Sequence, residues 1–294
     1  MNCDLKPKCL AALLFHNDED IVFDHINYYL NNNHELIIFN HNSNDKTHEI
    51  ICSFKSKFIK YYILNKNIIF KENKVHETVS KILLGEEVKY ENIQIYDLKT
   101  NNPKQMNECD NYNYSKNYDW ISFPESDEFL EGPNREKNYY EHLCELHKTK
   151  KKAIQFLNYV FWFTEKDDNN IPSTLERVKH YSFFRNCGPR MYAWRAKLTN
   201  IRWFGHNLPN NCLDTDVVKW KTRHYDARNY EQFVKKTIDR KDVAIGGQNY
   251  HYKNRINNLT AVREYGIIYS HELHFDDGKS ELIADDKFHW NKVY

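Results

Sequence analysis

The sequence lacks the features that mark membrane-spanning and nucleic-acid-binding proteins. No run of about 18 apolar residues occurs, so no transmembrane helix is expected. Lys and Arg number 42 and Asp and Glu number 41, which leaves a net charge of +1. A protein that binds nucleic acid or an anionic membrane through its surface charge would carry a basic excess. The charge balance therefore favours neither kind of partner.

Cysteine usage is not that of a disulfide-stabilised protein. The seven cysteines are odd in number, scattered along the chain, and never spaced as Cys-x-x-Cys. Zinc-ribbon and redox-motif interpretations therefore fail, and unpaired thiols in a reducing compartment are expected. The apolar stretch 9–15 is too short for a secretory signal. Together these observations predict a cytoplasmic protein.

The chain also has little that would separate domains. No linker rich in proline, glycine or serine occurs, and neither does an internal repeat or a long block of one charge. One domain spanning residues 1–294 is therefore the simplest prediction.

Strand and helix patterns alternate in the first part of the chain. Short apolar runs at 9–15 and 35–40 predict buried strands, and apolar residues at helical spacing follow at 21–30 and 47–54. This alternation with short connections implies parallel pairing through right-handed crossovers. We predict an α/β fold with a mixed, mainly parallel central sheet and helices on both faces. Further expected elements are strands at 120–123, 153–164 and 191–198 and helices at 105–109, 139–147 and 231–241.

The sharpest chemical feature is the segment 120–130, WISFPESDEFL. Its apolar start predicts a buried strand, which leads into a loop carrying Glu125 and Asp127. Ligands bind at the carboxyl ends of strands in open α/β sheets. Paired carboxylates there suit a hard divalent cation, and such a cation would neutralise a departing nucleoside diphosphate. The competing interpretation is a solvated acidic turn that only caps the next segment.

This segment resembles the acidic motif of the family 92 glycosyltransferases and their bacterial relatives in the family 2-like group. In that family a Trp and an apolar strand precede Asp-x-Asp and Glu-Phe-Leu. The resemblance extends over roughly residues 9–240, and four residues depart from it: His16 stands for Arg, Asn40 for Asp, Glu125 for the first Asp of the acidic motif, and Asn229 for Ser. Five other segments resemble the family's motifs in the same order, namely 16–21, 40–47, 105–109, 193–207 and 223–236.

The resemblance implies a GT-A (Rossmann-like) fold and inverting transfer of a sugar from a nucleotide-sugar, with a UDP-sugar as the first choice. The acceptor would be a hydroxyl of a glycan or another molecule, and Mn²⁺ or Mg²⁺ would be the cofactor. A nucleotide-binding half would cover about 9–130 and an acceptor-binding half about 131–294. The residues implied in binding the donor are Asn17, Asp18, Asn42, Ser43, Asp45, Glu125, Arg223 and Lys235.

The same resemblance implies a metal site and candidate catalytic residues. Asp127 would be the principal metal ligand, and Glu125, His206 and His224 would complete the shell. Inversion requires a general base that takes the acceptor proton. The candidates for that base are Asp214, Asp216 and Glu128. An exposed polar loop is the competing interpretation of Asp214 and Asp216.

Two other functions remain open on the sequence. The first is a nucleotide- or glycan-binding protein on the same fold that has lost catalysis. The second is a glycoside hydrolase in which Glu125, Asp127 and Glu128 supply an acid and a nucleophile. The hydrolase does not explain the amide-rich turns that follow the first two strands. Turnover of a nucleotide-sugar separates the transferase from the inactive binding protein, and lack of nucleotide affinity would favour the hydrolase.

Overall fold

The computed structural model describes residues 6–55, 57–65, 74–97, 99–110, 112–183, 190–197, 215–216, 220–239 and 273–284. The chain divides into two compact units. The first unit is Met1–Phe156 with Pro189–Lys221, and the second is Leu157–Gly188 with Thr222–Tyr294. The prediction of a single domain, with its two functional halves, stays a prediction.

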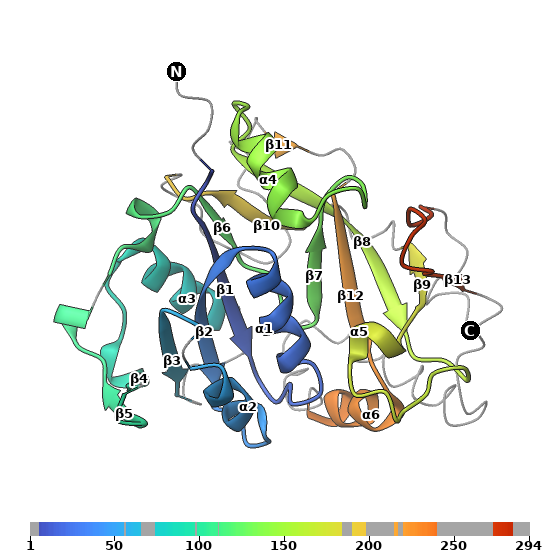
Figure 1. The fold of residues 1–294 in the computed structure, drawn as a ribbon. Coiled ribbons are helices and arrows are strands. Elements are labelled where there is room, and N and C mark those ends of the chain that lie inside the picture. Colours follow the sequence, from blue (N-terminus) through green and yellow to red (C-terminus); the bar gives the residue numbers. More distant parts are fainter. Residues whose placement is uncertain are drawn as a thin grey trace. The chain divides into compact units, whose positions relative to one another are not determined.

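Four parallel strands form the centre of the first unit (Figure 1). Their order is β6-β1-β2-β3, and β1 pairs in parallel with both β2 and β6. Every residue of β1 is buried, as is all of β2 but one residue. Strands buried on both faces read as continuous apolar runs, which explains why the sequence marked them clearly. The four strands are β1 (Cys9–Phe15), β2 (His34–His41), β3 (Lys60–Leu64) and β6 (Trp120–Ser122).

The flanks of this sheet are antiparallel. On one side β3 pairs with β4 and β4 with β5; on the other, β10 pairs with β6 and with the first half of β8. The prediction of a mixed sheet is therefore confirmed: the strands at its centre are parallel and those on its flanks are antiparallel. The two-residue β11 pairs in parallel with β8. These strands are β4 (Ile93–Asp97), β5 (Asn102–Gln105), β8 (Ala153–Trp162), β10 (Arg190–Arg195) and β11 (Thr215–Asp216).

The helix predicted at 105–109 is wrong. Gln105 ends the edge strand β5, and its amide Nε2 donates to the carbonyl of Ile93 at 2.9 Å. Only the short 3-10 turn Glu108–Asp110 follows. The segment has weak helical periodicity, so hairpin pairing with β4 decides its conformation.

The described residues of the first unit form four α-helices, and those predicted at 21–30, 47–54 and 139–147 are confirmed to within two residues. The last of these helices begins with a capping box, in which Asn138 and Glu141 each accept a hydrogen bond from the other's backbone N–H. In the loop that leads to this helix, Gly132 packs against the His142 ring, and a Cβ added to Gly132 would stand 1.9 Å from that ring. The helices are α1 (Val22–Asn31), α2 (Thr47–Ser53), α3 (Lys74–Leu84) and α4 (Tyr139–His147).

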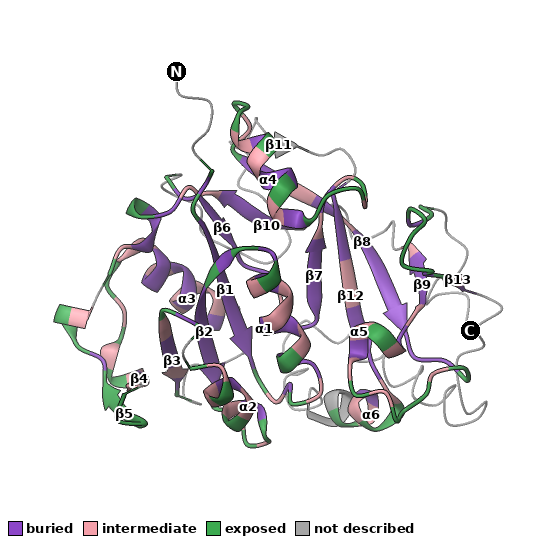
Figure 2. Cartoon of the chain, viewed as in Figure 1, coloured by how far each residue is buried: buried purple, intermediate pink, exposed green. Residues whose placement is uncertain are grey.

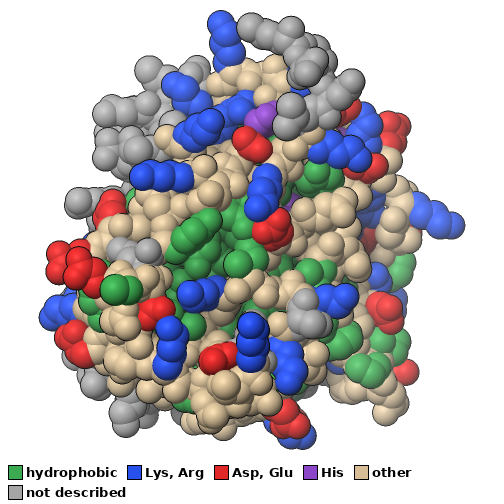
Figure 3. Space-filling model, turned by 60° about the vertical axis from the view of Figure 1, so that its left-hand side comes forward, with side chains coloured by type: hydrophobic (Ala, Val, Ile, Leu, Met, Phe, Trp, Pro, Cys, Tyr) green, Lys and Arg blue, Asp and Glu red, His purple; other side chains and the backbone are tan. Residues whose placement is uncertain are grey.

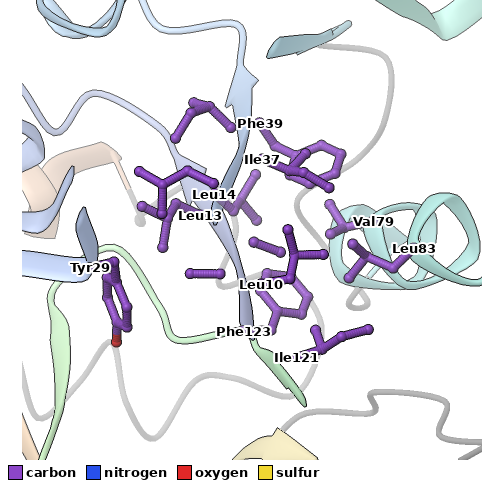
Figure 4. Close-up of a cluster of buried hydrophobic side chains, with 14 of the residues drawn as sticks. Leu10, Leu13, Leu14, Tyr29, Ile37, Phe39, Val79, Leu83, Ile121 and Phe123 are labelled. Atoms are coloured by element: carbon purple, nitrogen blue, oxygen red, sulfur yellow. The ribbon is translucent and has the colours of Figure 1, made fainter. Parts of the chain in front are cut away.

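The hydrophobic core of the first unit is one large cluster. It gathers buried side chains of β1, β2, β3, β6 and β10 with those of α1, α3 and α4. Figure 4 shows Leu10 and Leu13 of β1 together with Ile37 of β2 and with Val79 and Leu83 of α3. The central strands are buried along their length in Figure 2. Burial of this size fixes the strand ends, and therefore the loops that leave them.

The described part of the second unit contains five strands and helices besides the second half of β8. β9 pairs antiparallel with the second half of β8 and with β13. β12 also belongs here from Thr222 onward, and the Phe161 ring of β8 stacks on its Tyr225 at 4.8 Å. A small apolar cluster includes Val160, Trp162 and Phe233. The elements are β9 (His180–Phe183), β12 (Lys221–Ala227), β13 (His274–Phe275), α5 (Thr174–Arg177) and α6 (Tyr230–Asp239).

Surface and thiol features agree with the composition. Lys and Arg side chains intermingle with Asp and Glu on the face shown in Figure 3. Among the described residues, no helix is long and apolar enough to cross a membrane. The described cysteines Cys9, Cys52, Cys109 and Cys144 are free thiols.

Candidate functional site

The strand order of the first unit contains a topological switch point. From β1 the chain moves to β2 and then to β3 on one side, whereas β6 lies on the other side of β1. In open α/β sheets the ligand crevice lies outside the carboxyl ends of the strands at such a point. Two loops leave the sheet there: 16–20 after β1 and 123–127 after β6. Both carry residues that the sequence assigned to the site.

Hydrogen bonds join the loop after β1 to the loop after β2. The backbone N–H of Asn17 donates to Ser43 Oγ at 3.0 Å, and Asn17 Oδ1 accepts from the N–H of Asn44 at 2.9 Å. The N–H of Asp18, which is buried, donates to Thr47 Oγ1 at 2.8 Å. Each bond links residues more than 25 positions apart, so the two loops form one rigid rim at the sheet edge.

The Asp45 carboxylate completes this rim. Its Oδ2 accepts from the N–H of Glu19 at 3.2 Å, and its Oδ1 accepts from the N–H of Thr47 at 2.9 Å. Asn17 and Asn42 adopt positive φ angles of 56° and 49°. Asn tolerates this left-handed region better than most residues. Of the predicted nucleotide ligands here, Asn42 is the one whose side chain is exposed, while the others hold the loops.

Both atoms of the Asn40 side-chain amide form hydrogen bonds. Its Oδ1 accepts from the N–H of Ser43 at 3.0 Å, and its Nδ2 donates to the Tyr61 hydroxyl at 2.9 Å. That hydroxyl lies 2.7 Å from His48 Nδ1. Burial lowers the pKa of His48, so the neutral ring can accept the Tyr61 proton. Asn40 thus ties the start of the loop after β2 to β3 and α2.

The predicted metal-binding carboxylates lie in a tight turn after β6. The N–H of Glu128 donates to the carbonyl of Glu125 at 3.1 Å, and the N–H of Glu125 donates to Glu128 Oε2 at 3.4 Å. Asp127 is 4% exposed and Glu128 is fully buried, while Glu125 is half-buried. The Glu128 carboxylate therefore helps to close the turn that presents Glu125 and Asp127.

Helix α1 fixes the far side of this turn. β7 (Glu128–Glu131) follows the turn directly. His25 Nε2 donates to the Glu128 carbonyl at 2.9 Å, and the Tyr28 hydroxyl donates to the Leu130 carbonyl at 2.6 Å. The Phe129 ring packs edge-on against the His25 and Tyr28 rings of that helix. Because α1 begins right after the β1 loop, one helix positions both loops at the switch point.

The second unit carries the other predicted ligands. Arg223 forms an ion pair with the buried Asp276 at 2.9 Å, and its guanidinium lies 5.5 Å from the Phe161 ring centre. His224 and Asp226 lie on one face of β12 because they are two residues apart, and their side chains approach to 4.0 Å. Lys235 is exposed on α6.

Three predicted residues are described only in part or not at all. His206 and Asp214 lie outside the described residues. Asp216 is the last residue of β11, and its backbone pairs with Ile154 of β8 in the first unit. The backbone of Asp216 therefore belongs to a strand and not to a loop. Its role as the general base stays a prediction.

Sequence reasoning missed the residues that hold the loops. Thr47 accepts the buried N–H of Asp18, and Glu19 Oε2 accepts the N–H of Lys46 at 3.1 Å. No short motif encodes such a contact, because its partners are 27 to 29 residues apart. Asp226 was also missed, although a signal existed: a carboxylate two residues after His224 on a strand must share its face.

The chain shows only limited similarity to known proteins. No family model and no curated protein matches the chain. Among solved structures, a crystal structure of S. aureus TarS has a TM-score of 0.42 at 10% identity, covering 86% of this chain and 43% of that one. The TarS 1–349 structure has a TM-score of 0.37 at 10% identity, and its complex with UDP has 0.36 at 9%; each covers 88% of this chain and 72% of that chain. This chain thus spans less than half of the first structure.

Proposed function

We propose that the protein is a glycosyltransferase that moves a sugar from a nucleotide-sugar, a UDP-sugar first, onto an acceptor hydroxyl with inversion and divalent-metal assistance. One observation carries the proposal: an acid-x-acid turn, Glu125 to Asp127, follows β6 at the topological switch point beside β1. That is where nucleotides bind in open α/β sheets. The ordered resemblance to the family 92 and family 2-like glycosyltransferases supports the choice of reaction.

The donor set suits Mn²⁺ or Mg²⁺. These cations prefer carboxylate oxygens, and Mn²⁺ also accepts imidazole. We propose Asp127, Glu125, His206 and His224 as ligands, and we add Asp226 because its side chain approaches that of His224 to 4.0 Å. A bound metal would stabilise the negative charge of the departing diphosphate.

The rigid rim supports binding of the nucleotide. Side chains already bonded to one another need no reordering when a ligand arrives, which lowers the entropic cost of binding. We propose that Asn42 supplies hydrogen bonds to the base or ribose, while Asn17, Asp18, Ser43 and Asp45 hold the rim in shape. Arg223 is already paired with Asp276, so Lys235 is the better candidate for a diphosphate contact.

Three carboxylates, those of Glu128, Asp214 and Asp216, are candidates for the general base. It must reach the acceptor proton opposite the leaving group. Glu128 is fully buried and its Oε2 accepts the N–H of Glu125, which suits a structural role. We therefore propose Asp214 or Asp216 as the base.

A transfer assay on the intact protein tests the proposal. UDP release from a panel of UDP-sugars, with sugar acceptors and manganese present, should detect turnover. Asp127→Asn keeps size but deletes the charge, and it should lower turnover about a hundredfold or more. Glu125→Asp restores the family's residue and should preserve or raise turnover. Normal turnover by a folded Asp127→Asn protein would contradict the proposal, and nucleotide binding without any turnover would identify the inactive binding protein instead.

A further inference from the structure

The second unit contains a cavity of about 540 Å³, and none of the residues proposed for the transferase lines it. Volumes of 300 to 1,000 Å³ are typical of small-molecule sites. Its wall is formed by the loop after β8, by α5, and by residues at the start of β9 and around β13. The apolar residues of its lining are Ile171, Leu273 and Phe275. Phe275 is 62% exposed, and its ring lies 5.2 Å from that of His180.

The basic residues that line the cavity are Lys166, Arg177 and Lys179. Arg177 donates from NH1 to the Ile171 carbonyl at 2.9 Å and from NH2 to the Arg228 carbonyl at 3.4 Å. These two bonds orient the guanidinium, which also interacts electrostatically with the Asp167 carboxylate. The Lys166 ammonium has no ion-pair or hydrogen-bond partner within the described part of the chain.

The two carboxylates of the cavity are held by their own loop. Asp167 accepts from the Thr164 N–H at 2.9 Å and from the Thr164 hydroxyl at 3.3 Å. Asp168 Oδ1 accepts from the N–H and the side-chain amide of Asn170, both at 2.9 Å. Burial raises the pKa of Asp167 to about 6, so this carboxylate is still mostly ionised at pH 7. The lining of the cavity thus carries three basic side chains and two carboxylates.

We propose that this cavity is a second ligand site, which takes a small oxyanion carried on a ring-shaped or apolar body. The anionic group would contact Lys166 and Arg177, since guanidinium and ammonium groups bind phosphate and carboxylate through charge-assisted hydrogen bonds. The apolar body would cover Phe275 and Leu273, which removes an exposed aromatic ring from water. The site does not depend on the proposed transfer reaction.

Ligand-observed NMR titration of the full chain tests the site with simple probes. Phenyl phosphate and benzoate carry both features, inorganic phosphate carries only the charge, and phenol carries only the ring. We expect phenyl phosphate or benzoate to bind at least about tenfold more tightly than inorganic phosphate or phenol. The tighter of the two aromatic anions identifies the oxyanion.

Variants locate the binding. Lys166→Gln and Phe275→Ala change exposed side chains and should each weaken binding of the aromatic anion about tenfold. Lys150→Gln, at an exposed lysine of the first unit, is the matched control and should change nothing. Asp127→Asn should also leave this binding intact, even if it abolishes nucleotide binding. Absence of binding, or binding that is lost in Asp127→Asn and unchanged in Lys166→Gln and Phe275→Ala, would overturn the proposal.

Discussion

The two units use polar residues in different ways. In the first, a large apolar core holds parallel strands, and the polar loops at their carboxyl ends bond to one another across more than 25 residues. In the second, the described apolar cluster is small, and the ion pair between Arg223 and Asp276 is largely buried. The first unit therefore holds its polar loops on a large apolar core, whereas the described part of the second unit combines a small apolar cluster with a buried ion pair.

Core truncation should show the largest difference between the units. Leu13 is fully buried in the large cluster, so Leu13→Ala should lower the free energy of unfolding by about 2–5 kcal/mol. Leu273 is 4% exposed, belongs to the small cluster and already borders the cavity. Leu273→Ala should therefore cost less, below about 2 kcal/mol, because little new cavity forms. Urea unfolding followed by circular dichroism measures both, and equal losses would break the comparison.

Acid should weaken the first unit through His34. This ring is buried, and burial lowers its pKa from 6.5 to about 4. The unfolded chain therefore binds more protons than the folded one between these values, and stability is lost as pH falls from about 6.5 to 4. The loss attributable to His34 should reach about 3 kcal/mol. The measurement compares unfolding of wild type and His34→Gln from pH 7 to 4; a constant difference between them would contradict it.

Removing one loop contact should have a smaller effect. Thr47→Val keeps the shape of the side chain but leaves the buried Asp18 N–H without its acceptor. Such an unsatisfied donor costs about 1–3 kcal/mol. Thr78→Val is the matched control, because the Thr78 hydroxyl bonds to the Lys74 carbonyl on an exposed helix face, and it should cost less than about 0.5 kcal/mol. Similar costs for both variants in urea unfolding would remove the argument for a rigid rim.

The stability of the second unit should depend on pH in the opposite sense to that of the first unit, and more weakly. Burial raises the pKa of Asp167 from 3.8 to about 6, while bonds from Thr164 and the charge of Arg177 work against the shift. The folded state then holds the proton more tightly, so stability falls as pH rises from about 4 to 6. Asp167→Asn should abolish this component, and Asp168→Asn should retain it. The check is the pH dependence of unfolding for the two variants between pH 4 and 7.

The sequence predicted the first unit better than the second. Strands β1, β2 and β6 are buried on both faces and read as apolar runs, so their positions were clear. Their order along the chain then brought the loops carrying Asn42 and Asp127 to one edge. The edge hairpin at Asn102–Gln105 was missed because exposed strands carry no apolar pattern. Cross-loop contacts such as Asp18 to Thr47 depend on tertiary structure and leave no local signal.

The central claim is that the acidic turn after β6 forms a metal-assisted nucleotide site, and calorimetric titration of UDP tests it most directly. Wild type should bind UDP more tightly with manganese than in excess chelator, and Asp127→Asn should lose that difference. The control is Asp119→Asn, since Asp119 precedes the other end of the same strand and accepts the Lys8 N–H at 2.9 Å. It should behave as wild type. UDP affinity that is the same with manganese and with chelator, or a metal dependence that survives in a folded Asp127→Asn protein, would contradict the account.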